Sequence, residues 1–306
     1  MAFALKRPPE EKEITLEGIV DIAKSSDAAR MKETIRKVSE ILTEERSRSS
    51  GLRIRGNLHC IPLRGDAVVH SDLHGDEESL VELLRKTNFV ERVKRGESLM
   101  QVSLGDSIDR GQHPIEVLNI NLELKRYFPE NVVMLRGNHE ELFISPNAGA
   151  VSDFVYVLMR RYGDEAEGIY RGLHSLFSKM PLAAKSENRV LFLHGGVWDG
   201  MDEAGLVNGT NSEQVLWGDP REGIAGMERN RDRGIGFYFG ENVLVEALKN
   251  VQCDFLIRGH EPVSEENAVM FNGRLATVFS TGIHRNYGFV SLQNEIEDLR
   301  SVLQRF

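Results

Sequence analysis

Apolar and polar positions follow a helical period in the first part of the chain. Apolar side chains recur at helical spacing in two runs after Thr15, and Ser26 or Asp27 is placed to cap the second run. This pattern predicts two amphipathic helices within residues 15–46, of the kind that packs against a core. Residues 1–13 are expected to form a mobile lead-in, and residues 52–63 a pair of strands.

From residue 67 onward, short apolar strands each run directly into a polar motif. Amphipathic helices are expected at 77–88 and 114–127, and a mainly helical insert at 141–179. Because α/β proteins bind ligands at the carboxyl ends of their strands, the polar motifs should converge along one edge of a sheet. The five expected strands are Ala67–His70, Leu99–Leu104, Asn131–Leu135, Val190–Leu193 and Asp254–Ile257.

The motif after the second strand, Gly105 to Gly111, carries two carboxylates and a guanidinium. Burying a carboxylate at the end of a strand is costly unless a cation compensates it, so Asp106 is a candidate metal ligand. For this segment alone, the alternative is a polar strand-to-helix turn in which Asp109 caps a helix.

The polar residues at the strand ends are imidazole, carboxylate and carboxamide donors, with no thiolate among them. Such donors suit Mn²⁺, Fe or Zn²⁺, and six of them are too many for one ion that keeps a position open for substrate. Two ions are therefore expected, with Asp106 bridging them. Two ions about 3.5–4 Å apart lower the pKa of a bridging water, which is the chemistry of phosphoester hydrolysis. The six candidate ligands are Asp72, His74, Asp106, Asn138, His194 and His260.

Other polar residues fit the same reaction. Arg110 and Arg233 can neutralise phosphoryl oxygens, and His139, next to Asn138, is suited to protonate the leaving group if Asp109 orients it. His59, His113 and His174 are expected to be surface residues or structural residues with hydrogen-bond partners. For His284, a position at the mouth of the site is a second interpretation. For His70, which precedes the Ser71-Asp72 turn, a supporting role behind the metal ligands is a second interpretation.

Composition narrows the classes of protein. With 306 residues and 41% hydrophobic content, the chain can bury a full core, and we expect one catalytic domain over residues 1–306. The net charge of −9 argues against a nucleic-acid partner. The two cysteines, Cys60 and Cys253, are too few for a disulfide framework. Neither a signal segment nor a membrane-length apolar run is evident, so we expect a cytoplasmic protein without a membrane partner.

Together, the motifs resemble those of the phosphoprotein phosphatase family, the binuclear-metal serine/threonine phosphatases. The segments that carry the resemblance are Ser71–Gly75, Gly105–Gly111 and Gly137–Glu140, in that order, followed by segments around His194, Trp217, Arg233 and His260. The resemblance implies an α/β fold of the metallophosphoesterase type, a sandwich of two mixed β-sheets flanked by α-helices.

The resemblance also implies roles for individual residues. One metal would be held by Asp72, His74 and Asp106, and the other by Asp106, Asn138, His194 and His260. Arg110, Arg233 and Asn138 would hold the phosphate, and His139 paired with Asp109 would be the acid.

The chain departs from the family pattern at two small residues and in one loop. Ser71 stands where the family has Gly, a change that would strain the turn if φ were positive there, and Gly259 replaces a usual Ala. Residues 280–284 replace a loop that eukaryotic members carry beside the active site, and the chain is more similar to prokaryotic members.

The expected function is dephosphorylation of phosphoserine and phosphothreonine in proteins or peptides by attack of a metal-bridging hydroxide, with Mn²⁺ preferred over Fe or Zn²⁺. Hydrolysis of dinucleoside polyphosphates or other small phosphoesters is the alternative enzymatic function. A metal-free binding module is a third hypothesis. Any regulatory subunits are unknown.

Overall fold

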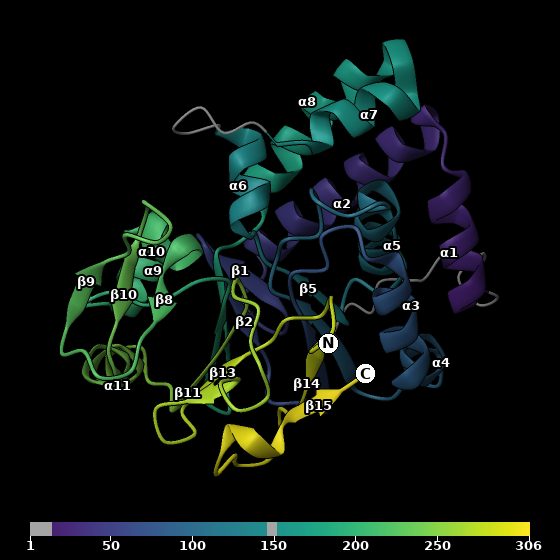
Figure 1. Cartoon of the computed structure of the whole chain (residues 1–306). Helices are drawn as coiled ribbons and strands as arrows, with labels where there is room; N and C mark the ends of the chain where they lie inside the picture. Colours follow the sequence, from purple (N-terminus) through teal and green to yellow (C-terminus); the bar gives the residue numbers. More distant parts are fainter. Residues whose placement is uncertain (1–13, 146–151) are drawn as a thin grey trace.

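Two β-sheets face each other across the middle of the computed structural model, which describes residues 14–145 and 152–306 (Figure 1). The five-stranded sheet has the order β15 (Leu303–Arg305), β14 (Asn286–Ser291), β3 (Asp66–His70), β4 (Leu99–Ser103) and β5 (Val132–Met134). The seven-stranded sheet has the order β1 (Arg53–Arg55), β2 (Leu58–Ile61), β6 (Ala183–Ser186), β7 (Val190–Leu193), β11 (Phe255–Arg258), β13 (Leu275–Thr277) and β12 (Val269–Met270).

Both sheets are mixed, and each contains three neighbouring parallel strands. β3, β4 and β5 run parallel while β14 is antiparallel to β3. In the other sheet β7, β11 and β13 run parallel while β6 is antiparallel to β7. Parallel strands end at the same edge, so each sheet brings several strand ends together.

Alternation along β3 shows how the two layers share the core. Ala67 and Val69 lie in the cluster between the sheets, which also contains Phe192 of β7 and Ile257 of β11. Val68 belongs instead to the cluster on the helical side. A strand covered on both faces reads as a continuous apolar run, which is why its sequence shows no polar alternation.

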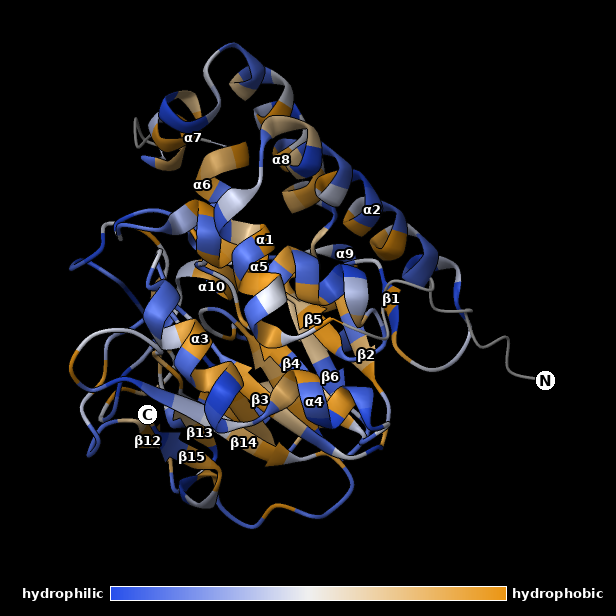
Figure 2. Ribbon diagram, turned by 90° about the vertical axis from the view of Figure 1, so that its right-hand side faces the viewer, coloured by the Kyte–Doolittle hydropathy of each residue, from blue (hydrophilic) through white to orange (hydrophobic). Residues whose placement is uncertain are grey.

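Helices from the first half of the chain cover the outer face of the five-stranded sheet (Figure 2). The predicted N-terminal helices are confirmed, because the Thr15 side chain accepts the Gly18 N–H and the Asp27 side chain accepts the Arg30 N–H at their starts. These helices are α1 (Leu16–Ser25), α2 (Ala28–Ser47), α3 (Glu77–Lys86), α4 (Phe89–Lys94) and α5 (Pro114–Tyr127).

The predicted insert is helical where the structure describes it. It comprises α6 (Asn138–Ile144), α7 (Phe154–Tyr162), a short 3₁₀ turn (Gly163–Glu165) and α8 (Ala166–Lys179). The buried residues of α8 belong to the same cluster as those of α2, and α7 and α8 stand at the top of the molecule in Figure 1. Residues 1–13 and 146–151, parts of the predicted lead-in and insert, lie outside the described residues.

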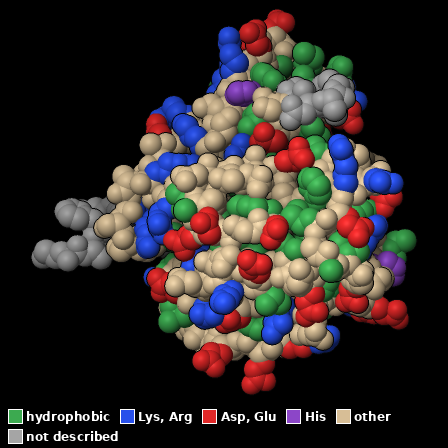
Figure 3. Space-filling view, turned by 90° about the vertical axis from the view of Figure 1, so that its left-hand side faces the viewer, with side chains coloured by type: hydrophobic (Ala, Val, Ile, Leu, Met, Phe, Trp, Pro, Cys, Tyr) green, Lys and Arg blue, Asp and Glu red, His purple; other side chains and the backbone are tan. Residues whose placement is uncertain are grey.

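A third, small sheet lies at the left of Figure 1. It consists of β8 (Asp219–Pro220), β10 (Phe237–Phe239) and β9 (Met227–Arg229), and the helices near it are α9 (Glu203–Asn208), α10 (Ser212–Trp217) and α11 (Glu241–Asn250). A last 3₁₀ turn (Leu299–Ser301) precedes β15. On the face shown in Figure 3, acidic side chains are interspersed with basic ones.

Two expectations about the strands need correction. The five strands that deliver polar motifs do not share one sheet, because β3, β4 and β5 belong to one and β7 and β11 to the other. Apolar content alone could not show this, since a strand buried in either sheet has the same pattern. The turn residues of the strand pair were expected at Arg64–Asp66, whereas the turn that joins β1 and β2 falls at residues 56–57. The two-sheet sandwich implied by the resemblance is confirmed.

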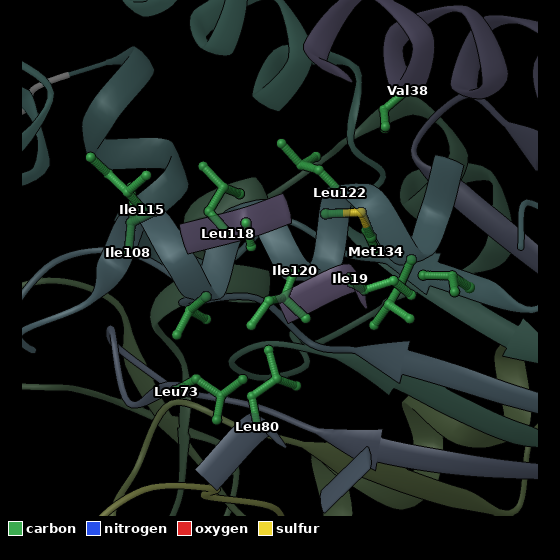
Figure 4. Close-up of a cluster of buried hydrophobic side chains, with 14 of the residues drawn as sticks. Ile19, Val38, Leu73, Leu80, Ile108, Ile115, Leu118, Ile120, Leu122 and Met134 are labelled. Atoms are coloured by element: carbon green, nitrogen blue, oxygen red, sulfur yellow. The ribbon is translucent and has the colours of Figure 1, made fainter. Parts of the chain in front are cut away.

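Apolar residues inside the polar motifs anchor them to the core. Leu73 and Ile108 are both buried and lie among Leu80, Ile115 and Leu118 under the helices (Figure 4). Burying such a side chain stabilises the fold by roughly 1.5–3 kcal/mol. These buried side chains hold each motif against the helices, and the polar side chains of the motif lie at the strand ends.

No helix in residues 14–145 or 152–306 combines the length and the apolar content that a bilayer crossing requires.

Candidate metal centre

Asp106 lies at the middle of the polar cluster formed where the strands of both sheets end. Its Oδ2 atom is 3.4 Å from Nε2 of His74 and 3.4 Å from Nε2 of His194. Asp106 is almost fully buried, and two groups of possible metal-binding atoms share it. One group contains His74 and His139 and the other contains His194 and His260, each with its atoms within 4.8 Å of one another.

Backbone carbonyls set the orientation of two of the imidazoles. Nδ1 of His74 lies 2.9 Å from the Ile108 carbonyl oxygen, and Nδ1 of His194 lies 3.0 Å from that of Leu104. A carbonyl only accepts, so each ring carries a proton on Nδ1 and turns Nε2 toward Asp106. This is the arrangement of metal-ligating histidines. Nε2 of His74 is buried and has no hydrogen-bond partner among the described residues.

Asn138, His194 and His260 converge on the other side of Asp106. Oδ1 of Asn138 is 2.8 Å from His194 Nε2 and 2.9 Å from His260 Nδ1. Burial, followed by the neighbouring His194, holds the pKa of His260 well below its usual value. A neutral imidazole nitrogen and an amide oxygen this close together are ligand atoms that a divalent cation can bind.

Asp72 lies at the edge of this cluster. Its Oδ1 is 3.8 Å from His74 Nε2, while Oδ2 accepts hydrogen bonds from the His260 N–H at 2.7 Å and the Ser71 hydroxyl at 2.6 Å. The backbone of Ser71 has no positive φ, so serine causes no strain at the position where the family has glycine.

The backbone is unusual at the cluster itself. Twelve described non-glycine residues have positive φ, and six of them belong to the predicted site. Such conformations cost about 1–3 kcal/mol each and gather at functional sites. These six are Asp72, His74, Asp106, Asp109, Arg110 and His260.

Glu140 holds the loops of Asp106 and Asn138 together. Its carboxylate accepts the backbone N–H groups of Asp106, Ser107 and Gly137 at 2.8–2.9 Å. A Cβ on Gly137 would lie 2.2 Å from Oδ1 of Asp106, so only glycine fits there. Glu140 belongs to a sequence motif, but its role could not be predicted, because the three donors lie on two separate loops.

The charges of the cluster favour cations. Burial opposes the ionised form of Asp106, but His194, His139 and His74 outweigh it and hold the pKa of Asp106 well below its usual value. In turn, although burial disfavours the charged imidazole, Asp106 raises the pKa of His194. A buried carboxylate that draws positive charge from its neighbours, beside an imidazole nitrogen without a partner, fits divalent metal ions.

His139, the third member of the first group, is paired with Asp109. Its Nδ1 is 2.7 Å from Oδ2 of Asp109, and its Nε2 is 3.0 Å from Nη2 of Arg110. Because a guanidinium only donates, Nε2 accepts from Arg110 and Nδ1 donates to Asp109 in this structure. Burial lowers the pKa of His139, but Asp106 and Asp109 together raise it above its ordinary value.

Arg233 approaches the cluster from the loop before β10. Asp219 holds it through a 2.5 Å contact with Nε, and its Nη2 lies 3.5 Å from the His260 carbonyl oxygen. The fully buried Arg258 contacts the same Asp219 at 3.1 Å and donates to the carbonyls of Gly195 and Gly218. The supporting roles of Asp219 and Arg258 were not predicted, since their partners are distant in the sequence.

All ten predicted site residues therefore lie in or beside one cluster at the junction of the two sheets. The donors form two groups around a shared carboxylate, with two arginines and an Asp-paired histidine nearby. This arrangement in an α/β sandwich is typical of the class of binuclear metal hydrolases. The family model described as calcineurin-like phosphoesterase matches residues 67–264, about two thirds of the chain. The chain belongs to this family.

Named relatives agree with this class. The chain is 28% identical over 282 residues to a probable serine/threonine-protein phosphatase of Encephalitozoon cuniculi, with 88% of this chain and 58% of that protein covered. It is 30% identical over 230 residues to a serine/threonine-protein phosphatase of Caenorhabditis elegans, with 72% and 48% covered. The chain thus spans about half the length of these curated relatives. Both are eukaryotic, so the greater similarity to prokaryotic members is not borne out.

The fold is also that of a solved structure. A serine/threonine phosphatase from Saccharomyces cerevisiae superposes with a TM-score of 0.72 at 22% identity, covering 96% of each chain. At this identity the likeness establishes the fold alone.

Proposed function

We propose that this chain is a metal-dependent phosphatase that hydrolyses phosphoserine and phosphothreonine monoesters in proteins. The observation that carries the proposal is Asp106, shared by two groups of buried metal-binding atoms, with the His139–Asp109 pair immediately beside it. The relatives named as serine/threonine-protein phosphatases support this substrate class.

The proposed metal ligands are drawn from the two groups, with two changes. Asp72 takes the place of His139, whose ring nitrogens face Asp109 and Arg110, and Asn138 joins the second group. Asp72, His74 and Asp106 would hold one ion, and Asp106, Asn138, His194 and His260 the other. When bound, two divalent ions supply Lewis acidity and lower the pKa of a coordinated water. Nitrogen and oxygen donors without thiolate favour Mn²⁺, with Fe or Zn²⁺ as alternatives.

The chain's own residues would bind the phosphoryl group and supply the proton. Arg110, Arg233 and Asn138 bind the phosphoryl oxygens, which draw Arg110 away from its contact with His139. Nε2 of His139 then faces the leaving serine oxygen. Once Arg110 has left, Nε2 takes up a proton, because burial is outweighed by Asp106 and Asp109, which raise the pKa of His139. As the P–O bond breaks and a water oxygen bonds to phosphorus, the serine oxygen takes that proton from Nε2, while Asp109 stabilises the ring through Nδ1.

Several features remain predictions. They are a single catalytic domain over residues 1–306, a cytoplasmic location, and phosphoproteins or phosphopeptides rather than nucleic acid or membranes as partners. Hydrolysis of dinucleoside polyphosphates is the competing activity.

A substrate panel tests the proposal. Metal-stripped protein is titrated with Mn²⁺, and phosphate release is measured from phosphoserine, phosphothreonine and phosphotyrosine peptides and from diadenosine tetraphosphate. We expect the phosphoserine and phosphothreonine peptides to be the preferred substrates, with activity complete at two metal equivalents. Asp106→Asn protein, prepared in the same way, controls for contaminating phosphatase. A preference for diadenosine tetraphosphate, or no release from any peptide with Mn²⁺, Fe²⁺ or Zn²⁺, would contradict the proposal.

A further inference from the structure

The carboxylate of Asp109 is hydrogen-bonded on both of its oxygens. Oδ2 faces His139, and Oδ1 accepts the hydroxyl of Ser152 at 2.8 Å and the backbone N–H of Phe154 at 2.8 Å. Asp109 and Ser152 are 4% and 3% exposed, so water does not compete freely for these bonds. Three donors thus fix the position and rotation of one carboxylate.

Two of the three donors come from the start of α7. Ser152 lies just before α7, and Phe154 is the first residue of that helix. The first N–H groups of a helix have no partner within it, and a carboxylate is well suited to accept one. The interpretation of Asp109 as a helix cap is therefore correct in part, but the helix lies more than forty residues away in sequence.

The insert holds this position firmly. The Phe154 side chain is fully buried, and its ring lies 6.0 Å from that of Phe143 on α6. The α6 helix begins at Asn138 and carries His139, so one packed unit presents both the imidazole and the donors that orient its carboxylate. A shift of α7 would alter the hydrogen bonds of Asp109 and, through Asp109, the direction of the His139 ring.

We propose that Ser152 is a positioning residue for proton donation. Its hydroxyl and the Phe154 N–H hold Asp109 in the rotation that directs Nε2 of His139 toward the leaving oxygen. This inference rests on the proposed function, because it needs a phosphoester whose leaving group takes a proton from His139. The seryl oxygen of a phosphoserine substrate is strongly basic and needs that proton, whereas an aryl oxygen such as p-nitrophenolate leaves readily without it.

The test compares two substrates in the metal-loaded full-length protein. The turnover number kcat is measured for a phosphoserine peptide and for p-nitrophenyl phosphate. His139→Asn should lower kcat for the peptide by about 10²–10⁴-fold and for the aryl ester much less. Ser152→Ala should show a weaker form of the same selectivity, on the order of a 10-fold loss with the peptide and little change with the aryl ester, because the Phe154 N–H remains.

Three further variants separate positioning from general damage. Ser152→Thr keeps the hydroxyl and should restore turnover of the peptide. Ser152→Ala added to His139→Asn should cause no further loss, since its effect passes through His139. The matched control is Ser186→Ala, which removes another buried, hydrogen-bonded hydroxyl at the β6–β7 turn and should leave both substrates unaffected. Metal content and thermal unfolding are recorded for every variant.

The outcomes distinguish the proposed phosphatase function from the positioning role of Ser152. If the wild-type protein hydrolyses neither substrate with added metal, the proposed function fails. If His139→Asn is selective but Ser152→Ala slows both substrates equally, or slows them further in the His139→Asn background, the function stands and the inference is overturned. If Ser152→Ala does not fold, Ser152→Cys, which has a weaker donor, takes its place with the same expected selectivity.

Discussion

A Cβ atom added to Gly259 would lie 1.9 Å from Oγ of Ser71. The two positions at which short motifs of this chain depart from the phosphoprotein phosphatase pattern are therefore in contact. Ser71 fills the space that the side chain of an alanine at position 259 would need, and its hydroxyl donates to the carboxylate of Asp72. Because Gly259 has no Cβ atom, there is room for the side chain of Ser71.

We predict that Gly259→Ala is tolerated only when Ser71 is also replaced. Alone, it should lower the free energy of unfolding by about 1–3 kcal/mol, the usual effect of overpacking, and weaken metal binding because it displaces Asp72. In a Ser71→Gly background the same change should cost less than half as much. Urea unfolding of the four proteins in a double-mutant cycle measures the coupling. Additive losses would show that the two positions do not share this space.

Asp106→Asn should remove at least one of two bound metal equivalents while the fold persists. The carboxamide keeps the shape and can still accept the His139 N–H, but it lacks the charge that would hold two dications. We expect affinity for one ion to fall by more than about 10–100-fold, the loss seen when only a supporting residue is changed. Metal analysis after dialysis and circular dichroism test this, with the exposed helix cap Asp202→Asn as control. Two retained equivalents would exclude a bridging role.

Arg110→Ala and Arg233→Ala should each lower kcat/KM by about 10²-fold, the effect of removing one preorganised donor from developing negative charge. Inorganic phosphate should also inhibit both variants less strongly, because the same guanidinium groups would bind it. Whether the loss is in KM or in kcat shows if an arginine binds the substrate and the transition state equally. The exposed Arg171→Ala is the control. A variant with normal kinetics and phosphate inhibition would remove that arginine from the site.

The local pattern of apolar and polar residues predicted the helices and strands that carry the site residues. The helix predicted at 114–127 is α5, and the strand predicted before Asp106 is β4, because apolar periodicity and proline placement act within a few residues. The metal ligands could be proposed for the same reason, since each one lies within four residues of the end of a buried strand.

Long-range partners could not be predicted in this way. Whether β7 shares a sheet with β3 depends on pairing between distant strands. The contact of Ser152 with Asp109 joins residues that are separated by all of α5, β5 and α6. His59 shows a further limit. It was expected to be a surface or hydrogen-bonded residue, but it is fully buried and neither ring nitrogen has a hydrogen-bond partner in the described part of the chain.

His70 should make the stability of the protein depend on pH. It is buried behind the site, where its Nε2 accepts from the Gln101 amide at 2.7 Å. Burial lowers the pKa of His70 to about 3, whereas an unfolded histidine has a pKa of about 6.5. Between these values the unfolded chain binds a proton that folded His70 does not, so stability is fully present above about pH 6.5 and is lost as the pH falls toward 3.

We predict that this histidine alone removes about 2 kcal/mol of unfolding free energy between pH 7 and pH 5. His70→Gln, which keeps a hydrogen-bond acceptor for Gln101 but does not titrate, should show a pH dependence that is shallower by that amount, although its stability at pH 7 is lower. Urea unfolding of both proteins at several pH values gives the difference directly, because all other titrating groups are common to the two. His113→Gln, at an exposed position, is the matched control. Parallel pH profiles for wild-type and His70→Gln protein would mean that His70 accepts a proton in the folded state, and hence that its surroundings admit water or charge.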